Sequence, residues 1–392
     1  MKTYYFDHSA STPMLPTVIE TMSELMKLHY ANPGALHRSG AEALKLVDRA
    51  RGSIAERMGA KPEEIIFTSG GTESNNLAIK GSIHKATRAN KHIITSAVEH
   101  ASVYECVRQL EAMGIRTTVV PVDRFGRVNP EDVESAITKD TVLVSIMQVN
   151  NETGVVQPIS ELGNVISRFP HVRFHVDGVQ AIGKVPFDWT GWGVHMYSGS
   201  AHKFGGPKGM GFLLLKSGVE LAPLLNGGDQ EQGFRSGTQN VPGIVAMSQA
   251  LRLTMESRDS RRARMYAMRR QLLDVVDQIP ELFINGVHSN MDNAETETAP
   301  HVVNLSYPGM RPEVIIHMLE KHGILVSTQS ACSSKSLLPS RVLLAMGHDE
   351  DRASGSIRIS FGDEHTDKDI EILGERLKSV VAKLKPLERN IK

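Results

Sequence analysis

The stretch VRFHVD, residues 172–177, is a short β-rich run that ends on a carboxylate. Its length and its apolar side chains are typical of a strand buried in a sheet. In open α/β sheets, ligands bind outside the carboxyl ends of the strands, so an aspartate in this place is a candidate ligand contact. Taken alone, Asp177 fits the capping of the next helix equally well. The sequence on either side separates the two interpretations.

Similar β-rich runs precede and follow this stretch, and helical patterns separate most of them. The runs occupy residues 64–69, 92–97, 117–122, 141–149, 194–199 and 211–216. In one intervening segment, Val103, Val107, Leu110 and Met113 recur at the helical spacing. Strands that alternate with helices predict an α/β fold with a mostly parallel, seven-stranded sheet that helices cover on both faces.

The pattern changes after Val241. One long helical stretch over 243–279 is followed by a smaller α+β pattern that ends in a C-terminal helix. We therefore predict a large domain over 15–258 and a smaller α+β domain over 259–392, joined by the N-terminal segment 1–14.

Composition narrows the functional class. The 44 basic and 44 acidic side chains cancel, which gives no reason to expect a nucleic acid or a membrane as partner. The N-terminal residues lack an apolar signal segment, and two cysteines in 392 residues cannot form a disulfide framework, so we expect a cytoplasmic protein. The arginine-rich segment 257–271 fits a solvated helix face better than an RNA or partner surface. The sixteen histidines show no spacing that indicates a metal site.

Polar residues follow the predicted strands at the positions where ligands bind. The residues are Gly71 and Thr72, His100, Asn151, Asp177 with Gln180, and Lys203, the last in SAHKFGGPKG at 200–209. Each has an ordinary interpretation by itself, such as a turn, a helix cap or a surface lysine. Together they place an anion-binding turn, an imidazole, an amide, a carboxylate and an amine at one sheet edge.

Pyridoxal phosphate requires this combination of groups. Its aldehyde forms a Schiff base with a lysine, its pyridine nitrogen needs a carboxylate partner, and its phosphate needs an anion site. We therefore predict that Lys203 anchors the cofactor, with Asp177 as the partner of the ring nitrogen. The glycines that follow Lys203 are expected to admit the cofactor closely.

The chain resembles the cysteine desulfurases of the NifS/IscS type from residue 4 to about residue 363. The resemblance is carried, in order, by YFDHSASTP, NPGALHRSG, TSGGTESNN, NNETGVVQP, HVDGVQAIGK, GSAHKFGGPKGMG, RSGTQN and SACSS. It implies a fold type I pyridoxal-phosphate enzyme that acts as a homodimer. Such enzymes convert L-cysteine to L-alanine and leave a persulfide on an enzyme cysteine.

The resemblance also implies roles for particular residues. Lys203 would form the Schiff base, Asp177 would pair with the ring nitrogen, Gln180 would bind the phenolic oxygen, His100 would stack on the ring, and Asn151 would contact cofactor or substrate. The phosphate site would comprise Gly71, Thr72, Ser200 and His202, with Thr238 reaching the phosphate of the other subunit. Arg358 would bind the substrate carboxylate through its planar guanidinium.

The two cysteines are predicted to differ in function. Cys106 falls on the helical period between Val103 and Leu110 and is interpreted as a buried apolar residue. Cys332 lies in the small, polar run STQSACSSKS, which cannot bury much surface. We expect the thiolate of Cys332, favoured by nearby Lys335, to attack the substrate sulfur and carry the persulfide.

Two other functions remain open at this point. One is a different fold type I enzyme, such as a selenocysteine lyase or an aminotransferase. The other is a binding module or sulfur-carrier scaffold without turnover, against which the retention of Arg358 and Cys332 argues. The sequence leaves the sulfur acceptor open among an iron–sulfur scaffold, a tRNA-thiolation protein and a dedicated carrier.

Overall fold

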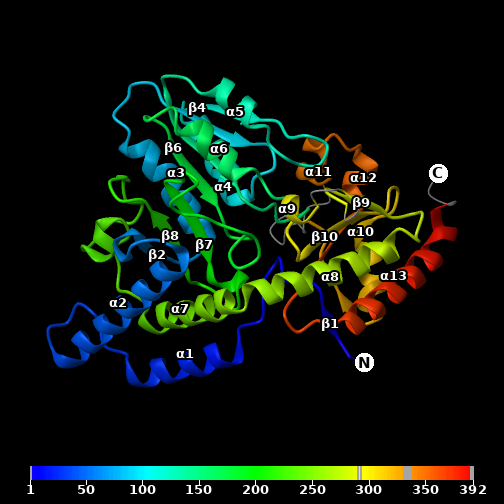
Figure 1. The fold of residues 1–392 in the computed structure, drawn as a ribbon, viewed down its shortest axis with the longest axis horizontal. Helices are drawn as coiled ribbons and strands as arrows, with labels where there is room; N and C mark the ends of the chain where they lie inside the picture. Colours follow the sequence, from blue (N-terminus) through cyan, green and yellow to red (C-terminus); the bar gives the residue numbers. More distant parts are fainter. Residues whose placement is uncertain (1, 289–290, 292–293, 330–337, 389–392) are drawn as a thin grey trace.

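A computed structural model describes residues 2–288, 291, 294–329 and 338–388 of the chain. Figure 1 shows two lobes, a larger one built on a twisted sheet and a smaller one that contains the C-terminal helix. Helices α7 (Val241–Glu256) and α8 (Arg258–Val276) run end to end from the first lobe into the second. In the part of the chain that is described, no helix is long and apolar enough to cross a bilayer.

The larger lobe is organised by a seven-stranded sheet. In spatial order its strands are β2 (Ile65–Thr68), β8 (Gly211–Leu215), β7 (Met196–Ser200), β6 (Arg173–Asp177), β5 (Thr141–Met147), β3 (His92–Ser96) and β4 (Arg116–Val120). Only β8 runs antiparallel to its neighbours in this sheet. The predicted mostly parallel, seven-stranded α/β sheet is confirmed.

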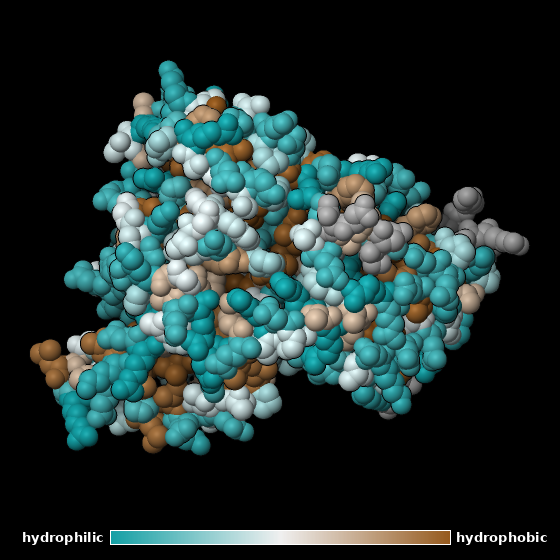
Figure 2. Space-filling model, in the orientation of Figure 1, coloured by the Kyte–Doolittle hydropathy of each residue, from teal (hydrophilic) through white to brown (hydrophobic). Residues whose placement is uncertain are grey.

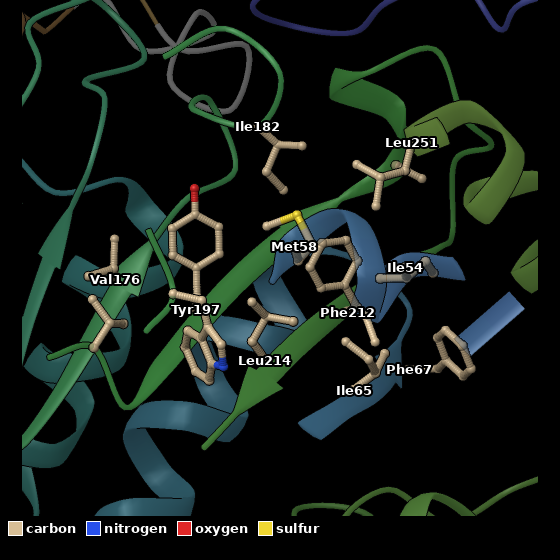
Figure 3. Close-up of a cluster of buried hydrophobic side chains, with 14 of the residues drawn as sticks. Ile54, Met58, Ile65, Phe67, Val176, Ile182, Tyr197, Phe212, Leu214 and Leu251 are labelled. Carbon is tan, nitrogen blue, oxygen red and sulfur yellow. The ribbon is translucent and has the colours of Figure 1, made fainter. Parts of the chain in front are cut away.

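Both faces of this sheet are buried, because successive side chains of a strand point to opposite faces. On β2, Ile65 and Phe67 join one hydrophobic cluster and Ile66 joins another. The first cluster includes side chains of α2 (Arg38–Met58), α6 (Ile159–Ile166) and α7, and Figure 3 shows part of it around Tyr197 and Phe212. The second includes side chains of α3 (Gly71–Lys85) and α4 (Ala101–Ala112). Helices α1 (Pro16–Leu28) and α5 (Pro130–Ala136) complete the larger lobe.

The smaller lobe has its own sheet and hydrophobic cluster. Its antiparallel strands are β12 (Ser356–Ser360), β10 (Val302–Ser306) and β9 (Phe283–Asn285), accompanied by α8, α9 (Ala294–Glu297), α10 (Pro312–Glu320), α11 (Arg341–Ala345), α12 (Glu350–Ser354) and α13 (Asp367–Glu388). The N-terminal strand β1 (Tyr4–Tyr5) pairs in parallel with β11 (Ile324–Leu325), and Phe6 enters the cluster of this lobe. The predicted domain boundary between 258 and 259 stays a proposal, which the separate clusters support.

The predicted single helix over 243–279 is wrong, because Ser257 interrupts it. Its backbone has φ −106° and ψ 6°, and its hydroxyl donates to the Leu253 carbonyl at 2.9 Å. Serine competes for backbone hydrogen bonds in this way and therefore favours helix ends. The arginine-rich helix α8 then turns toward the smaller lobe, where Arg261 pairs with Asp363 at 2.5 Å. This pairing supports the interpretation of that segment as a helix face.

Candidate functional site

A cavity lies at the carboxyl ends of the parallel strands, where the predicted site residues meet. Its lining includes Gly71, Thr72, His100, Asn151, Asp177, Gln180, Ser200, His202, Lys203 and Arg358. The topology explains the convergence, because β2, β3, β5, β6 and β7 are mutually parallel and end at one edge of the sheet. Among the predicted site residues that the structure describes, all except Thr238 therefore line this cavity.

Asp177, the last residue of β6, is buried and fixed by two donors. Its Oδ2 accepts a hydrogen bond from Asn75 Nδ2 at 2.7 Å, and its Oδ1 accepts one from the Val179 N–H at 3.0 Å. Asn75 Nδ2 also donates to Ser102 Oγ at 2.8 Å. With a donor on each oxygen, the carboxylate keeps one orientation.

Lys203 ends a short 3₁₀ turn after β7, and its amine faces the N-terminal segment of the chain. Its Nζ donates to the Ala10 carbonyl at 2.9 Å and also to the Ser9 carbonyl. The predicted role of the following glycines is wrong. Gly205 (φ +77°) packs against the N-terminal segment, where an added Cβ would lie 2.7 Å from Leu15 Cγ. Gly205 thus lets the two segments approach each other, and neither it nor Gly206 lines the cavity.

His100 is held by the start of α4, whose N-cap it forms. Its Nδ1 accepts a hydrogen bond from the Ser102 N–H at 3.2 Å and lies 2.8 Å from Ser102 Oγ. Because a backbone N–H can only donate, the neutral ring carries its proton on Nε2. Burial lowers the pKa of His100, with smaller effects from Asp177, which raises it, and Lys203, which lowers it. The site therefore holds a neutral imidazole whose Nε2 is available for proton transfer.

The anion-binding turn lies where β2 leads into α3. A Cβ added to Gly71 would lie 2.6 Å from Val179 Cγ2 and 3.6 Å from Ser200 Cβ, so a glycine is needed for the close approach. The 15-residue helix α3 directs its unpaired N–H groups and positive dipole end at this place. Burial, and then the charge of Lys203, lower the pKa of His202 to about 4, so its ring is neutral. The turn, the amine and the carboxylate fit a phosphate-bearing aldehyde cofactor.

Arg358 projects from β12 of the smaller lobe into the cavity and is almost completely buried. Its guanidinium donates to Asp7 Oδ1 and to the Asn151 carbonyl, both at 2.9 Å. Among the described residues its Nε has no hydrogen-bond partner. A substrate carboxylate that binds Arg358 would therefore meet a guanidinium that is already paired with the Asp7 carboxylate.

The sequence of this chain is similar to those of known proteins. Residues 4–373 match the aminotransferase class-V family. The chain belongs to this family. A NifS/IcsS protein homolog of Lactobacillus delbrueckii subsp. bulgaricus is 43% identical over 92% of this chain and 93% of its own length. The putative cysteine desulfurase IscS 1 of Bacillus subtilis is 40% identical over 98% of this chain and 100% of its own.

The fold of this chain is also that of a solved structure. A NifS-like protein, 35% identical, superposes with a TM-score of 0.89 and covers 98% of this chain and 99% of its own. The predicted resemblance to NifS/IscS-type cysteine desulfurases is confirmed, as are the fold and the enzyme class.

Thr238 does not line the cavity. Thr238 is exposed, in the loop before α7, and its predicted contact with the other subunit's cofactor stays a prediction. Cys332 lies outside the described residues. Cys106 is buried on α4, and burial raises the pKa of its thiol to about 11, so it is a poor nucleophile.

Sequence reasoning missed four groups that orient the predicted ones. They are Asp7, which pairs with Arg358; the Ser9 carbonyl, which receives the Lys203 amine; and Asn75 with Ser102, which link Asp177 to His100. Asp7 and Ser9 stand in the motif YFDHSASTP, where they count only toward the family resemblance. Their contacts with Lys203 and Arg358, which are 194 and 351 positions away, give no local signal.

A cluster of three titratable residues lies outside the lining of the cavity. His8, Glu364 and His365 bring potential metal-ligand atoms within 4.8 Å of one another. The geometry is unfavourable for a metal, because His365 Nδ1 accepts the Gly362 N–H at 2.8 Å. A neutral ring with its lone pair so engaged presents an N–H, and no lone pair, at Nε2. We interpret the group as a polar contact between the N-terminal segment and the smaller lobe.

Glu99, next to His100, is fully buried, and the desolvation of its carboxylate raises its pKa from 4.5 to about 8. Because the folded value exceeds the unfolded one, the stabilising proton is present below pH 4.5 and is lost as the pH rises through 8. Glu99→Gln mimics the protonated acid. We expect it to leave the unfolding free energy near wild type at pH 5 and to raise it by a few kcal/mol at pH 8.5. Urea unfolding at both pH values checks this, and an equal effect at both would contradict a raised pKa.

Proposed function

We propose that this protein is a cysteine desulfurase that uses pyridoxal phosphate to convert L-cysteine to L-alanine. The observation that carries the proposal is the convergence of Lys203, Asp177 and His100 in one cavity. An amine, a fixed carboxylate and a neutral imidazole are the groups that this cofactor requires. The names of the relatives supply the substrate, since several are called cysteine desulfurases.

The residues around the cavity would hold the cofactor as follows. Lys203 would bind its aldehyde, Asp177 its ring nitrogen, Gln180 its phenolic oxygen and His100 the face of its ring. Its phosphate would bind at the N-terminus of α3, at Gly71 and Thr72, and to Ser200 and His202 of the same chain. Thr238 of the partner subunit would complete the phosphate site. When bound, pyridoxal phosphate supplies an electron sink for the bond-breaking steps at the substrate's carbons.

The remaining chemistry belongs to this chain. Arg358 and Asn151 would orient the substrate, and the Lys203 amine, once L-cysteine has taken its place, would remove the α-proton. The Cys332 thiolate would attack the substrate sulfur, so that a sulfur–sulfur bond forms as the carbon–sulfur bond breaks. The carbon takes up a proton and leaves as L-alanine. The sulfur is oxidised and the carbon is reduced, so no other oxidant is needed.

Replacing each cysteine in turn tests this function. In Cys332→Ala, alanine production from L-cysteine should fall to the background level, because no thiol remains to accept the sulfur. In Cys106→Ala, production should stay within about twofold, because that thiol is buried and protonated. Alanine is measured by mass spectrometry. Unchanged alanine production in Cys332→Ala would contradict sulfur transfer to this thiol. Transfer of the amino group of L-cysteine to a 2-oxo acid, without alanine formation from cysteine and unchanged in Cys332→Ala, would favour an aminotransferase. Turnover of selenocysteine alone would favour a selenocysteine lyase.

The proposed homodimer is supported by an apolar surface on α1, the loop that follows it and the start of α2. Its members are Ile19, Met26, Leu28, Leu36 and Leu44, of which Leu36 is fully exposed. Figure 2 shows brown side chains in this part of the molecule. Monomeric proteins rarely expose such a patch, whereas dimers bury one.

We expect Leu36→Asp to shift the protein from dimer to monomer, because it places a charge in the buried interface. Light scattering during size-exclusion chromatography measures the mass. Val314→Asp, which places the same charge on α10 of the smaller lobe, is the matched control. A Leu36→Asp variant that keeps the dimer mass would exclude this surface as the interface.

The sulfur acceptor would be a protein, either an iron–sulfur scaffold, a tRNA-thiolation enzyme or a dedicated carrier. The names of the IscS relatives favour the first. The proposed location is the cytoplasm, because the chemistry requires Cys332 to remain a free thiol.

A further inference from the structure

His301, at the start of the smaller lobe's central strand, contacts the cavity residue Gln180 across the boundary between the lobes. Its side chain is completely buried, and its Nε2 lies 3.3 Å from Gln180 Oε1. The backbone of His301 is fixed as well, because its carbonyl accepts the Phe361 N–H at 2.9 Å. Since Gln180 Oε1 can only accept, the His301 proton in this contact is on Nε2.

Gln180 in turn shares an acceptor with the candidate Schiff-base lysine. Its Nε2 donates to the Ser9 carbonyl at 2.9 Å, and Lys203 Nζ donates to the same carbonyl. Gln180 Oε1 accepts from His301, and one Nε2 hydrogen is donated to the Ser9 carbonyl. Rotation that exchanges the amide oxygen and nitrogen would break both hydrogen bonds. Its other Nε2 hydrogen is left to face the cavity that Gln180 lines.

A second buried side chain, Lys184, acts on His301 through its charge. Its Nζ is buried, and neither Nζ nor His301 Nδ1 has a hydrogen-bond partner within the described ranges. The charge of Lys184 is the strongest charge effect on His301, ahead of His8, Lys203 and Arg358. Lys184 itself is faced by Lys203, Arg261 and Asp363.

Buried apolar side chains lie close to this contact in the chain. Val149, Ala181 and Ala299 form a small buried apolar cluster between the lobes. Burial lowers the pKa of Lys184 to about 7 and lowers that of His301, so His301 is neutral. The positive charge of Lys184 opposes a second proton on the ring, so the neutral imidazole keeps its single proton on Nε2, which it donates to Gln180.

We propose that His301, with its ring proton on Nε2, is a positioning residue that orients the Gln180 amide toward the cofactor's phenolic oxygen, and that the buried Lys184 acts on the site through His301. The inference rests on the proposed function, because it concerns the residue assigned to that oxygen. Through His301, the smaller lobe would thus help to set the pKa of the linkage between Lys203 and the cofactor.

The pH dependence of the cofactor's visible absorption tests this. When the linkage loses its proton, negative charge remains on the phenolic oxygen, which a Gln180 N–H stabilises. Removing the His301 donor should therefore raise the midpoint pH of the absorbance change, by about one unit in His301→Leu. His301→Gln, which keeps an N–H near the Nε2 position, should restore most of the wild-type midpoint.

A double-mutant cycle identifies the route by which Lys184 acts. If Lys184 acts through His301, Lys184→Met shifts the midpoint upward in the wild type and adds nothing in His301→Leu. Lys378→Met, an exposed lysine on α13, is the matched control and should leave the midpoint unchanged. Circular dichroism confirms that each variant is folded.

The outcomes separate this inference from the proposed function. A wild-type protein that shows no visible absorption with pyridoxal phosphate would overturn the proposed function itself. If the wild type binds the cofactor, an unchanged midpoint in His301→Leu and His301→Gln would overturn the positioning role of His301. A full Lys184→Met shift in the His301→Leu background would show that Lys184 acts directly, and would overturn its part.

Discussion

Lys203→Ala should lower the rate of alanine formation from L-cysteine by about 10³-fold or more, because one amine anchors the cofactor and moves the α-proton. The loss should appear in kcat, and added pyridoxal phosphate should not restore it. Borohydride reduction of the wild-type holoenzyme should fix the cofactor to the peptide that contains residue 203. The variant should retain no covalently bound cofactor after the same treatment.

Lys208→Ala is the matched control for this variant. Lys208 is five positions further along the same loop, is exposed and does not line the cavity. We expect its activity to stay within about twofold, as for most surface substitutions. Equal losses in the two variants would show that the loop, and not the amine of residue 203, matters.

Asp177→Asn should lower kcat by about 10²- to 10³-fold, because it removes the charge that keeps the cofactor's ring nitrogen protonated. The structure adds a second cost. Both oxygens of Asp177 accept, from Asn75 Nδ2 and from the Val179 N–H, so either orientation of an asparagine amide would set one NH₂ group against a donor. We therefore also expect stability to fall by about 1–3 kcal/mol.

Exchanging the two side chains separates these effects. Asn75→Asp combined with Asp177→Asn keeps the hydrogen bond between positions 75 and 177 but moves the carboxylate away from the strand end. Stability should recover, whereas kcat should remain low. Recovery of kcat as well would show that the hydrogen bond, and not a charge at position 177, is what the reaction needs.

The larger lobe can be predicted from the sequence because its strands are strongly patterned. Runs such as 141–149 and 172–177 are largely apolar, and their alternation with helices permits few topologies. Because the polar side chains stand at the ends of those runs, most of the site follows from the sequence alone. The break at Ser257 does not, because both flanking segments are helical and a single serine carries little weight against them.

The groups that orient the site are beyond prediction for a different reason. Arg358 pairs with Asp7 and His301 contacts Gln180, and these pairs are 351 and 121 positions apart. Such contacts depend on how the two lobes meet, which no local pattern encodes. The glycines after Lys203 give the opposite case. Their local pattern favours a contact with the cofactor, whereas in the structure Gly205 packs against Leu15, which is distant in the sequence.

The most direct test of the account is to locate the transferred sulfur. Holoenzyme with bound pyridoxal phosphate is incubated with L-cysteine, alkylated under non-reducing conditions and digested, and each cysteine peptide is weighed. We predict one additional sulfur atom, about 32 Da, on the peptide that contains Cys332, and none on the peptide that contains Cys106. Sulfur on Cys106, or alanine formation without sulfur on either cysteine, would contradict the central claim.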